Sequence, residues 1–117
     1  PEVSIRKLAA ACGCDYVRVI NPFNLDQVVK TYVEAFQRDD AAVIVSKAPC
    51  TLIKGLTKKP PVNFIESNCN NCDKCVSELA CPAISKMNGK ITVDKSQCDG
   101  CNVCIQVCKY GALEAGR

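Results

Sequence analysis

The sequence predicts an α/β fragment built around one parallel βαβ unit, followed by a small, cysteine-rich α+β domain. Two observations predict this division. Helix and strand patterns alternate over residues 4–46, whereas most of the eleven cysteines gather between Cys69 and Cys108. We therefore expect an α/β part over residues 1–57, a linker over 58–61 and a separate domain over 62–117. Because the chain begins at Pro1 rather than Met, we also expect it to be a piece of a longer protein.

Composition narrows the classes of protein that fit. The 117 residues are 48% hydrophobic and 23% charged, which suits one or two small domains with modest cores. The net charge is +3 and both signs are mixed along the chain, so the sequence gives no reason to expect a nucleic-acid partner. No apolar run reaches the roughly 20 residues that span a membrane, and no secretory signal is visible at the start. We expect no membrane partner and a cytoplasmic location.

The first expected element is a helix that starts after Ser4. Ser4 can cap the helix, and Gly13 can adopt the left-handed conformation that ends it. Four residues share the expected buried face of this helix: Ile5, Leu8, Ala9 and Cys12.

A strand, a helix and a second strand are expected next. Residues 16–20 are rich in β-forming types, Asn21-Pro22 ends the strand, and Asn24 with Gln27 resembles a capping box. The helix that follows carries apolar residues at the spacing of a buried face: Leu25, Val28, Val29, Tyr32, Val33 and Phe36. Residues 41–45 form a continuous apolar run, as in a parallel strand buried on both faces. Two strands cannot bury both of their faces alone, so we expect the end of a larger α/β domain.

Paired prolines separate the two parts. The stretch Lys58-Lys59-Pro60-Pro61 favours an extended, semi-rigid connector, which is why we place the linker there.

The second part is an internal repeat about 29 residues apart. Matched positions are Cys69 with Cys98, Cys72 with Cys101, and Cys75 with Cys104, and each repeat closes with one further cysteine, Cys81 or Cys108. Between the repeats, Asn88-Gly89 predicts a hairpin of residues 84–87 and 90–93. Residues 62–66 are expected to pair with 112–114. The pattern indicates a duplicated module with two similar half-sites.

Cysteines at this spacing indicate metal binding rather than disulfides, since the total number of cysteines is odd and export signals are missing. Zinc is one alternative, because C-x2-C pairs also build zinc ribbons. Zinc takes four ligands per site, however, which leaves the third cysteine of each run and the Cys81-Pro82 pair unexplained. The run from Cys98 to Cys108 has the spacing of the two-cluster bacterial ferredoxins, C-x2-C-x2-C-x3-C. We therefore predict two 4Fe-4S clusters in a small ferredoxin-like α+β domain.

In that ferredoxin run the last cysteine ligates the other cluster. The similarity implies one cluster held by Cys69, Cys72, Cys75 and Cys108, and another held by Cys98, Cys101, Cys104 and Cys81. Two departures bear on this assignment. Five residues rather than three separate Cys75 from Cys81, so we expect a longer or bulged first helix, and Lys109 stands where the first repeat has Pro82.

Three cysteines lie outside the repeats. Cys12 and Cys14 flank a glycine at a helix end, and Cys50 follows Pro49 at a strand end. We expect these thiols to pack in the core, which is their ordinary role; the alternative is a redox or active-site role.

The first part is the more discriminating half of the sequence. Residues 11–36, ACGCDYVRVINPFNLDQVVKTYVEAF, followed by AAVIVSKAPC and a two-cluster domain, resemble the C-terminal end of the α subunits of indolepyruvate:ferredoxin oxidoreductases. In that family a cysteine-glycine helix end, an Asn/Asp-Pro-aromatic-x-Leu turn and a strand ending in Pro-Cys close the thiamine-diphosphate domain.

The resemblance implies an enzyme that oxidatively decarboxylates arylpyruvates, which are 2-oxoacids, to aryl-acetyl-CoA and passes the electrons to soluble ferredoxin. Its implied partners are the upstream part of the same subunit and a β subunit. The family holds thiamine diphosphate through Mg2+ with a Gly-Asp-Gly motif that this sequence lacks, so no catalytic residue is assigned to this chain. The alternative is a free-standing two-cluster ferredoxin, or another iron-sulfur carrier, whose α/β part docks a partner.

Overall fold

The computed structural model describes residues 3–50, 53, 55 and 58–117. Contacts divide the chain into two compact units, Pro1–Pro49 and Cys50–Arg117, which we call the first and second units. Each unit is described by itself below. Within the described residues, no helix is both long enough and apolar enough to cross a bilayer.

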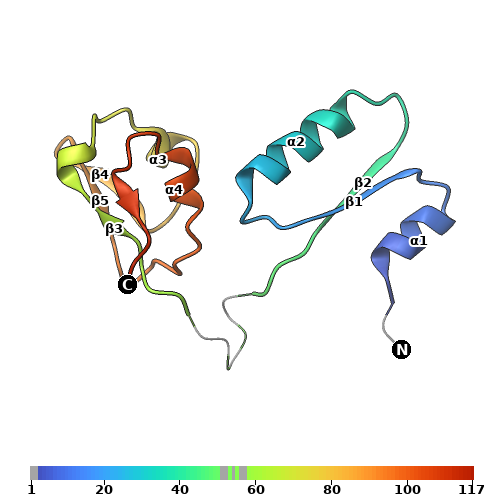
Figure 1. Ribbon diagram of the computed structural model, residues 1–117, viewed down its shortest axis with the longest axis horizontal. Helices are drawn as coiled ribbons and strands as arrows, with labels where there is room; N and C mark the ends of the chain where they lie inside the picture. Colours follow the sequence, from blue (N-terminus) through green and yellow to red (C-terminus); the bar gives the residue numbers. More distant parts are fainter. Residues whose placement is uncertain (1–2, 51–52, 54, 56–57) are drawn as a thin grey trace. The chain divides into compact units, whose positions relative to one another are not determined.

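The first unit is a parallel βαβ crossover preceded by a helix (Figure 1). Helix α1 (Ile5–Ala11) is capped by the Ser4 side chain, which accepts a hydrogen bond from the Lys7 N–H, and Gly13 after it has a φ of +86°. Strand β1 (Tyr16–Ile20) pairs in parallel with β2 (Ala42–Ser46), with Tyr16 opposite Ala42. The predicted parallel pair and the predicted end of the first helix are confirmed.

Helix α2 (Leu25–Phe36) joins the two strands, and its start differs in detail from a capping box. Asn24 Oδ1 accepts a hydrogen bond from the Gln27 N–H at 3.1 Å, as predicted. The Gln27 side chain does not reach back to Asn24; its Oε1 accepts from the Asn21 N–H at 3.0 Å instead. That bond anchors the turn after β1 to the first turn of the helix.

The buried face predicted for α2 is wrong for the first unit as it stands. Thr31 is the buried residue of this helix, because the face around it packs on β1. The predicted face remains open, and its most exposed members are Val29, Tyr32, Val33 and Phe36. Helix α1 likewise buries none of its residues, and β2 is only half-buried. The helices and strands of the first unit therefore carry apolar side chains on surfaces that no other part of this unit covers.

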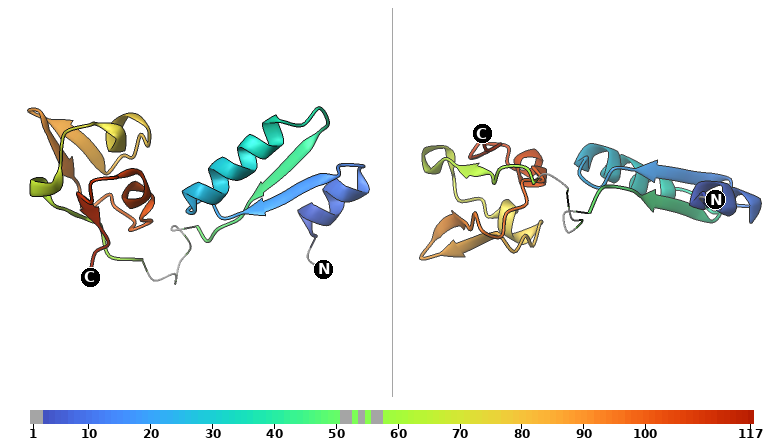
Figure 2. Two further views of the ribbon diagram at one scale, coloured as in Figure 1. Left: turned by 45° about the horizontal axis from the view of Figure 1, so that its top comes forward. Right: turned by 90° about the horizontal axis from the view of Figure 1, so that it is seen from below.

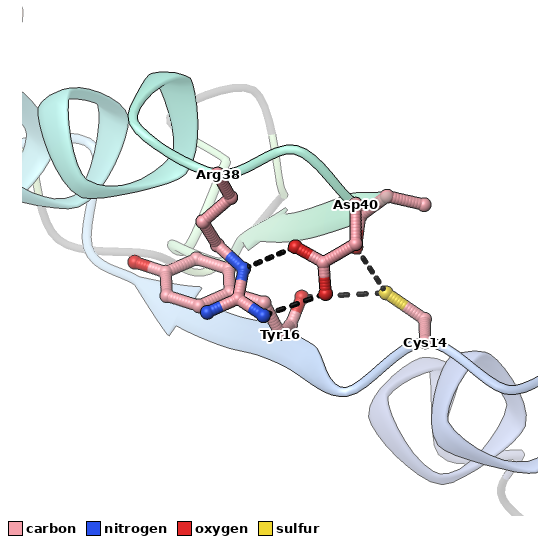
Figure 3. A network of polar contacts seen from close by, with 5 residues as sticks. Cys14, Tyr16, Arg38 and Asp40 are labelled. Atoms are coloured by element: carbon pink, nitrogen blue, oxygen red, sulfur yellow. Dashed lines mark hydrogen bonds and ion pairs between the residues drawn. The ribbon is translucent and has the colours of Figure 1, made fainter.

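A polar network ties the start of β1 to the segment before β2 (Figure 3). Arg38 donates to both carboxylate oxygens of Asp40, at 2.7 and 2.6 Å, and this bond lowers the pKa of Asp40. The Arg38 guanidinium also lies 5.0 Å from the centre of the Tyr16 ring. The Tyr16 hydroxyl donates to the Glu34 carboxylate at 3.0 Å, so this strand end is fixed to α2.

The second unit contains two antiparallel pairs and two short helices (Figure 2). Strand β3 (Asn63–Phe64) pairs with β6 (Leu113–Glu114), and the hairpin β4 (Ile84–Met87) and β5 (Lys90–Val93) turns at Asn88-Gly89. Both turn residues have positive φ, +50° and +79°, as the predicted hairpin requires. The 3₁₀ turn η1 (Glu66–Asn68) and the helices α3 (Lys74–Ser77) and α4 (Val103–Val107) complete the unit.

A small core holds this unit together. Five buried residues form it: Val62, Ile84, Ile91, Cys104 and Leu113. Five further cysteines pack against them while half-buried, so sulfur atoms supply part of the core. With so few apolar residues inside, burial of side chains supplies only a modest part of the folding free energy of this unit.

The prolines predicted as a linker pack onto the second unit. A Cβ atom on Gly100 would lie 2.5 Å from the Pro60 carbonyl oxygen, and one on Gly116 would collide with Pro61. Residues 59–61 are therefore packed against two glycines of the second unit.

Candidate metal centre

Four thiols from both repeats come together beside α3. Burial raises the pKa of the Cys75 thiol, and the nearby thiols of Cys108, Cys69 and Cys72 raise it further. All four cysteines line one cavity, whose wall also includes apolar residues such as Phe64, Ile91 and Leu113. We call Cys69, Cys72, Cys75 and Cys108 the first set.

The second set consists of Cys98, Cys101, Cys104 and Cys81. Its most buried member is Cys104, on α4, whose exposed fraction is 6%. Burial raises the pKa of this thiol to about 11, and the charges of Cys101, Cys98 and Cys81 act in the same direction. The two sets thus contain the same residues that the ferredoxin spacing groups together.

Each set takes its last cysteine from the other repeat. Cys108 follows α4 directly, and its N–H donates to the Cys104 carbonyl at 3.0 Å, yet its thiol lies with the first set. Cys81 follows α3 and its thiol lies with the second set. The end of α4 therefore presents one thiol to each set, although Cys108 itself has left the helix for an extended conformation.

We predicted a longer or a bulged first helix, and the extra residues of the first repeat do not lengthen it. Helix α3 ends at Ser77, and the chain then turns through Ala80, which has a left-handed φ of +46°. A longer helix would carry Cys81 farther along the axis of α3. The turn is what returns Cys81 to the second set.

The loops before α3 and α4 share one backbone pattern. Asn71 and Gly100 occupy equivalent positions and have φ values of +57° and +64°, and Asp73 and Asn102 match in the same way, at +60° and +63°. Left-handed residues between helical ones turn successive N–H groups toward one side, which suits an anionic group held by the loop. Duplication is therefore visible in the backbone as well as in the spacing of the cysteines.

The donor chemistry fits iron-sulfur clusters. Each set offers four thiols in a partly buried, apolar setting, which is the ligand type and number that a 4Fe-4S cluster requires. Zinc needs its four donors about 2.1–2.3 Å from one ion. Within the part of the chain that the structure describes, no three Cys, Asp or Glu side chains are placed to hold a single metal ion.

The three remaining cysteines lie in or next to the first unit and do not share one environment. The Cys14 thiol is half-buried and donates to the carbonyls of Tyr16 and Ala41, at 3.4 and 3.2 Å (Figure 3). These bonds link the chain before β1 to the chain before β2, which is a structural role. Cys12 and Cys50 are exposed, so the core-packing interpretation is wrong for these two in the structure described here.

Sequence reasoning missed several residues around the two sets. Tyr110 lines the cavity of the first set, and the Val62 N–H donates to the Cys98 sulfur at 3.5 Å. The position of Tyr110, two residues after a predicted ligand, was the available signal for it. Val62 lies far from Cys98 in the sequence, so no sequence signal linked these two residues.

Comparison with known protein families gives the class of the second unit. Residues 90–113 match the family model described as a 4Fe-4S binding domain, so the second unit is an iron-sulfur domain of the ferredoxin type. The matched region contains β5, α4 and the second cysteine run.

Curated relatives extend the similarity over nearly the whole chain. The chain is 38% identical over 114 residues to indolepyruvate oxidoreductase subunit IorA of Methanothermobacter marburgensis, covering 97% of this chain and 18% of that protein. It is 29% identical over 119 residues to IorA of Archaeoglobus fulgidus, with 98% and 19% covered. IorA of Pyrococcus horikoshii is 32% identical over 124 residues, with 99% and 19% covered. The chain is therefore a homologue of IorA subunits and spans about a fifth of their length.

Proposed function

We propose that this chain is the electron-transfer segment of an indolepyruvate:ferredoxin oxidoreductase. The observation that carries the proposal is the grouping of the thiols, in which Cys75 lies with Cys108 and Cys104 lies with Cys81. We assign the first set as the ligands of one 4Fe-4S cluster and the second set as the ligands of the other. When bound, such a cluster accepts and releases single electrons.

The residues of the chain have three tasks in this function. The eight cysteines give up their thiol protons and present thiolate sulfur. The core residues around Cys104 keep water away from the second set, and the Val62 N–H donates to the Cys98 sulfur. None of these tasks needs an acid or a base, which agrees with the lack of an assigned catalytic residue.

The first unit is, in this proposal, the end of the thiamine-diphosphate domain of the same subunit. Its support is the similarity to IorA, which includes the first unit, and the apolar surface that this unit leaves uncovered. Thiamine diphosphate and Mg2+ would be bound by upstream sequence. The substrates would be a 2-oxoacid and CoA, the acceptor a soluble ferredoxin, and the partner a β subunit, all in the cytoplasm, where thiols stay reduced.

Anaerobic purification of the chain tests the proposal. We expect about eight irons and about eight inorganic sulfides per chain, and interacting EPR signals from two clusters after reduction. Zinc at stoichiometric amounts, or no metal, in oxygen-free protein would contradict it. Electron transfer from the reduced chain to a ferredoxin, followed by absorbance under anaerobic conditions, tests the direction of the proposed relay.

A further inference from the structure

The two cysteine loops differ in one respect despite their shared backbone. Asn71 of the first loop is exposed, whereas its equivalent in the second loop, Gly100, is buried. The cause is the segment of residues 58–62, which we call the strap. A Cβ atom on Gly100 would lie 2.8 Å from both the Cβ atom and the carbonyl oxygen of Lys59, so only glycine leaves room for the strap there.

Three further contacts hold the strap in place. Lys58 Nζ lies 3.2 Å from Asp99 Oδ1, in the same loop as Gly100. Pro60 and Pro61 pack against Gly116 near the end of the chain. Val62 closes the strap with an exposed fraction of 1%, inside the core that contains Cys104. The strap is therefore a fixed part of the second cysteine site.

The strap also contacts a sulfur atom directly. The Val62 N–H donates to Cys98 Sγ at 3.5 Å, which is a hydrogen bond from outside the cysteine loop. In the first loop, the Cys72 N–H donates to Asn70 Oδ1, and the Cys69 thiol is itself a donor, to Asn71 Oδ1 at 3.9 Å. The first sulfur of the second set, Cys98, therefore accepts an N–H bond, whereas the bond shown at the first sulfur of the first set, Cys69, is one that its thiol donates.

We propose that the Val62 N–H sets the two clusters apart in reduction potential, by donating to the Cys98 thiolate of the second set. The inference rests on the proposed function, because it requires clusters in both sets. An N–H donor stabilises negative charge on sulfur, and the reduced cluster carries more of it. The bond therefore raises the potential of the cluster in the second set and leaves that of the first set unchanged. Val62 acts through Cys98 and is a positioning residue.

The first test removes the donor. Val62→Pro deletes the N–H and keeps an apolar ring of similar size, whereas Val62→Ala keeps the N–H and reduces the packing. We expect Val62→Pro to lower the reduced-to-oxidised ratio of the second-set cluster roughly threefold at a fixed potential, since hydrogen bonds to charged groups are among the stronger ones. Val62→Ala should change this ratio much less.

A second pair of variants displaces the strap without touching Val62. Gly100→Ala forces the strap off the loop, and Asn71→Ala is the matched control at the same backbone conformation with no strap above it. Gly100→Ala should shift the second-set potential in the same direction as Val62→Pro, and Asn71→Ala should leave that potential unchanged. This pair answers the question if Val62→Pro does not fold.

Both tests use the full chain with its clusters, in an anaerobic redox titration followed by EPR. The titration contains one reduction step for each cluster. The step that belongs to the second set is first identified with Cys101→Ser, which should alter that step selectively. A wild-type chain without clusters would overturn the proposed function. If the wild-type chain holds both clusters, two results would overturn the role of Val62 and leave the proposed function standing. One is an equal shift of the second-set potential in Val62→Pro and Val62→Ala. The other is a Gly100→Ala variant in which neither reduction potential shifts.

Discussion

Cys75 and Cys108 belong to different repeats, yet their thiols share one site. Burial raises the pKa of Cys75 most, and among the neighbouring thiols Cys108 contributes the largest increase. In the ligand sets that we propose, each repeat supplies the last cysteine of the other's set.

Replacing Cys108 by serine tests this exchange. We expect Cys108→Ser to damage the cluster of Cys69, Cys72 and Cys75 and to spare the other, so that iron content falls toward about half of the eight irons of a two-cluster chain. Iron and sulfide analysis with EPR of the reduced protein measures this. Cys12→Ser, an exposed thiol outside both sets, is the control and should keep full content. Selective loss of the Cys98 and Cys101 signals would show that the exchange is wrong.

Removal of iron should unfold the second unit. Its core is small and includes Cys104, while its other ligand cysteines pack half-buried or exposed around it, so cluster ligation supplies much of its folding free energy. Treatment with a chelator and an oxidant should abolish the cooperative loss of structure on heating, measured by circular dichroism or by hydrogen exchange at β4 and β5. A cluster-free chain that keeps slow exchange in this hairpin would contradict the prediction.

The helix cap at Asn24 should stabilise the first unit. Asn24→Ala removes the acceptor for the Gln27 N–H and should lower the free energy of unfolding by about 1 kcal/mol. Urea unfolding monitored by circular dichroism measures this. Gln37→Ala, at the other end of α2, is the matched control, because the Gln37 contacts that define this helix end come from its backbone N–H. Equal effects of the two changes would exclude a specific cap.

Tyr16 should make the first unit sensitive to alkaline pH. Burial raises the pKa of this hydroxyl, and its bond to Glu34 raises it further. Because the folded pKa exceeds the unfolded value of about 10, the stabilisation is complete below that value and is lost as pH rises through the folded pKa. Ultraviolet titration of tyrosinate should show one of the three tyrosines ionising late, and Tyr16→Phe should remove that phase. A single phase in the wild-type chain would refute this assignment.

The open face of α2 should make the isolated chain associate. Phe36 is 85% exposed and lies beside Tyr32, with ring centres 6.4 Å apart. Exposed apolar patches of this kind favour association. Phe36→Ser should therefore reduce self-association in sedimentation velocity with little change in thermal stability. Lys30→Ser, on the same helix, should change neither. A marked loss of stability in Phe36→Ser would mean that the ring packs within the unit after all.

Local chemistry explains the elements that could be predicted. Ser4, Asn24 and the Asn88-Gly89 turn act on residues two to four positions away, and the structure places each of them as expected. The cysteine grouping stays a prediction of a different kind, because it rests on the spacing of a known iron-sulfur run, which restricts which thiols can meet. The proposed ligand sets extend that restriction to both repeats.

The features that could not be predicted depend on contacts between distant segments. Apolar periodicity showed that α2 has a face to bury, but it could not show that the side around Thr31 packs on β1 while Val33 stays open. The proline pair indicated an extended segment, but not that it lies on Gly100. Helix caps, turns and ligand spacing are thus fixed by the sequence alone, because they involve neighbours along the chain. The strap, the open helix face and the bond from Val62 to Cys98 were decided by the tertiary structure, since packing joins residues that the sequence keeps apart.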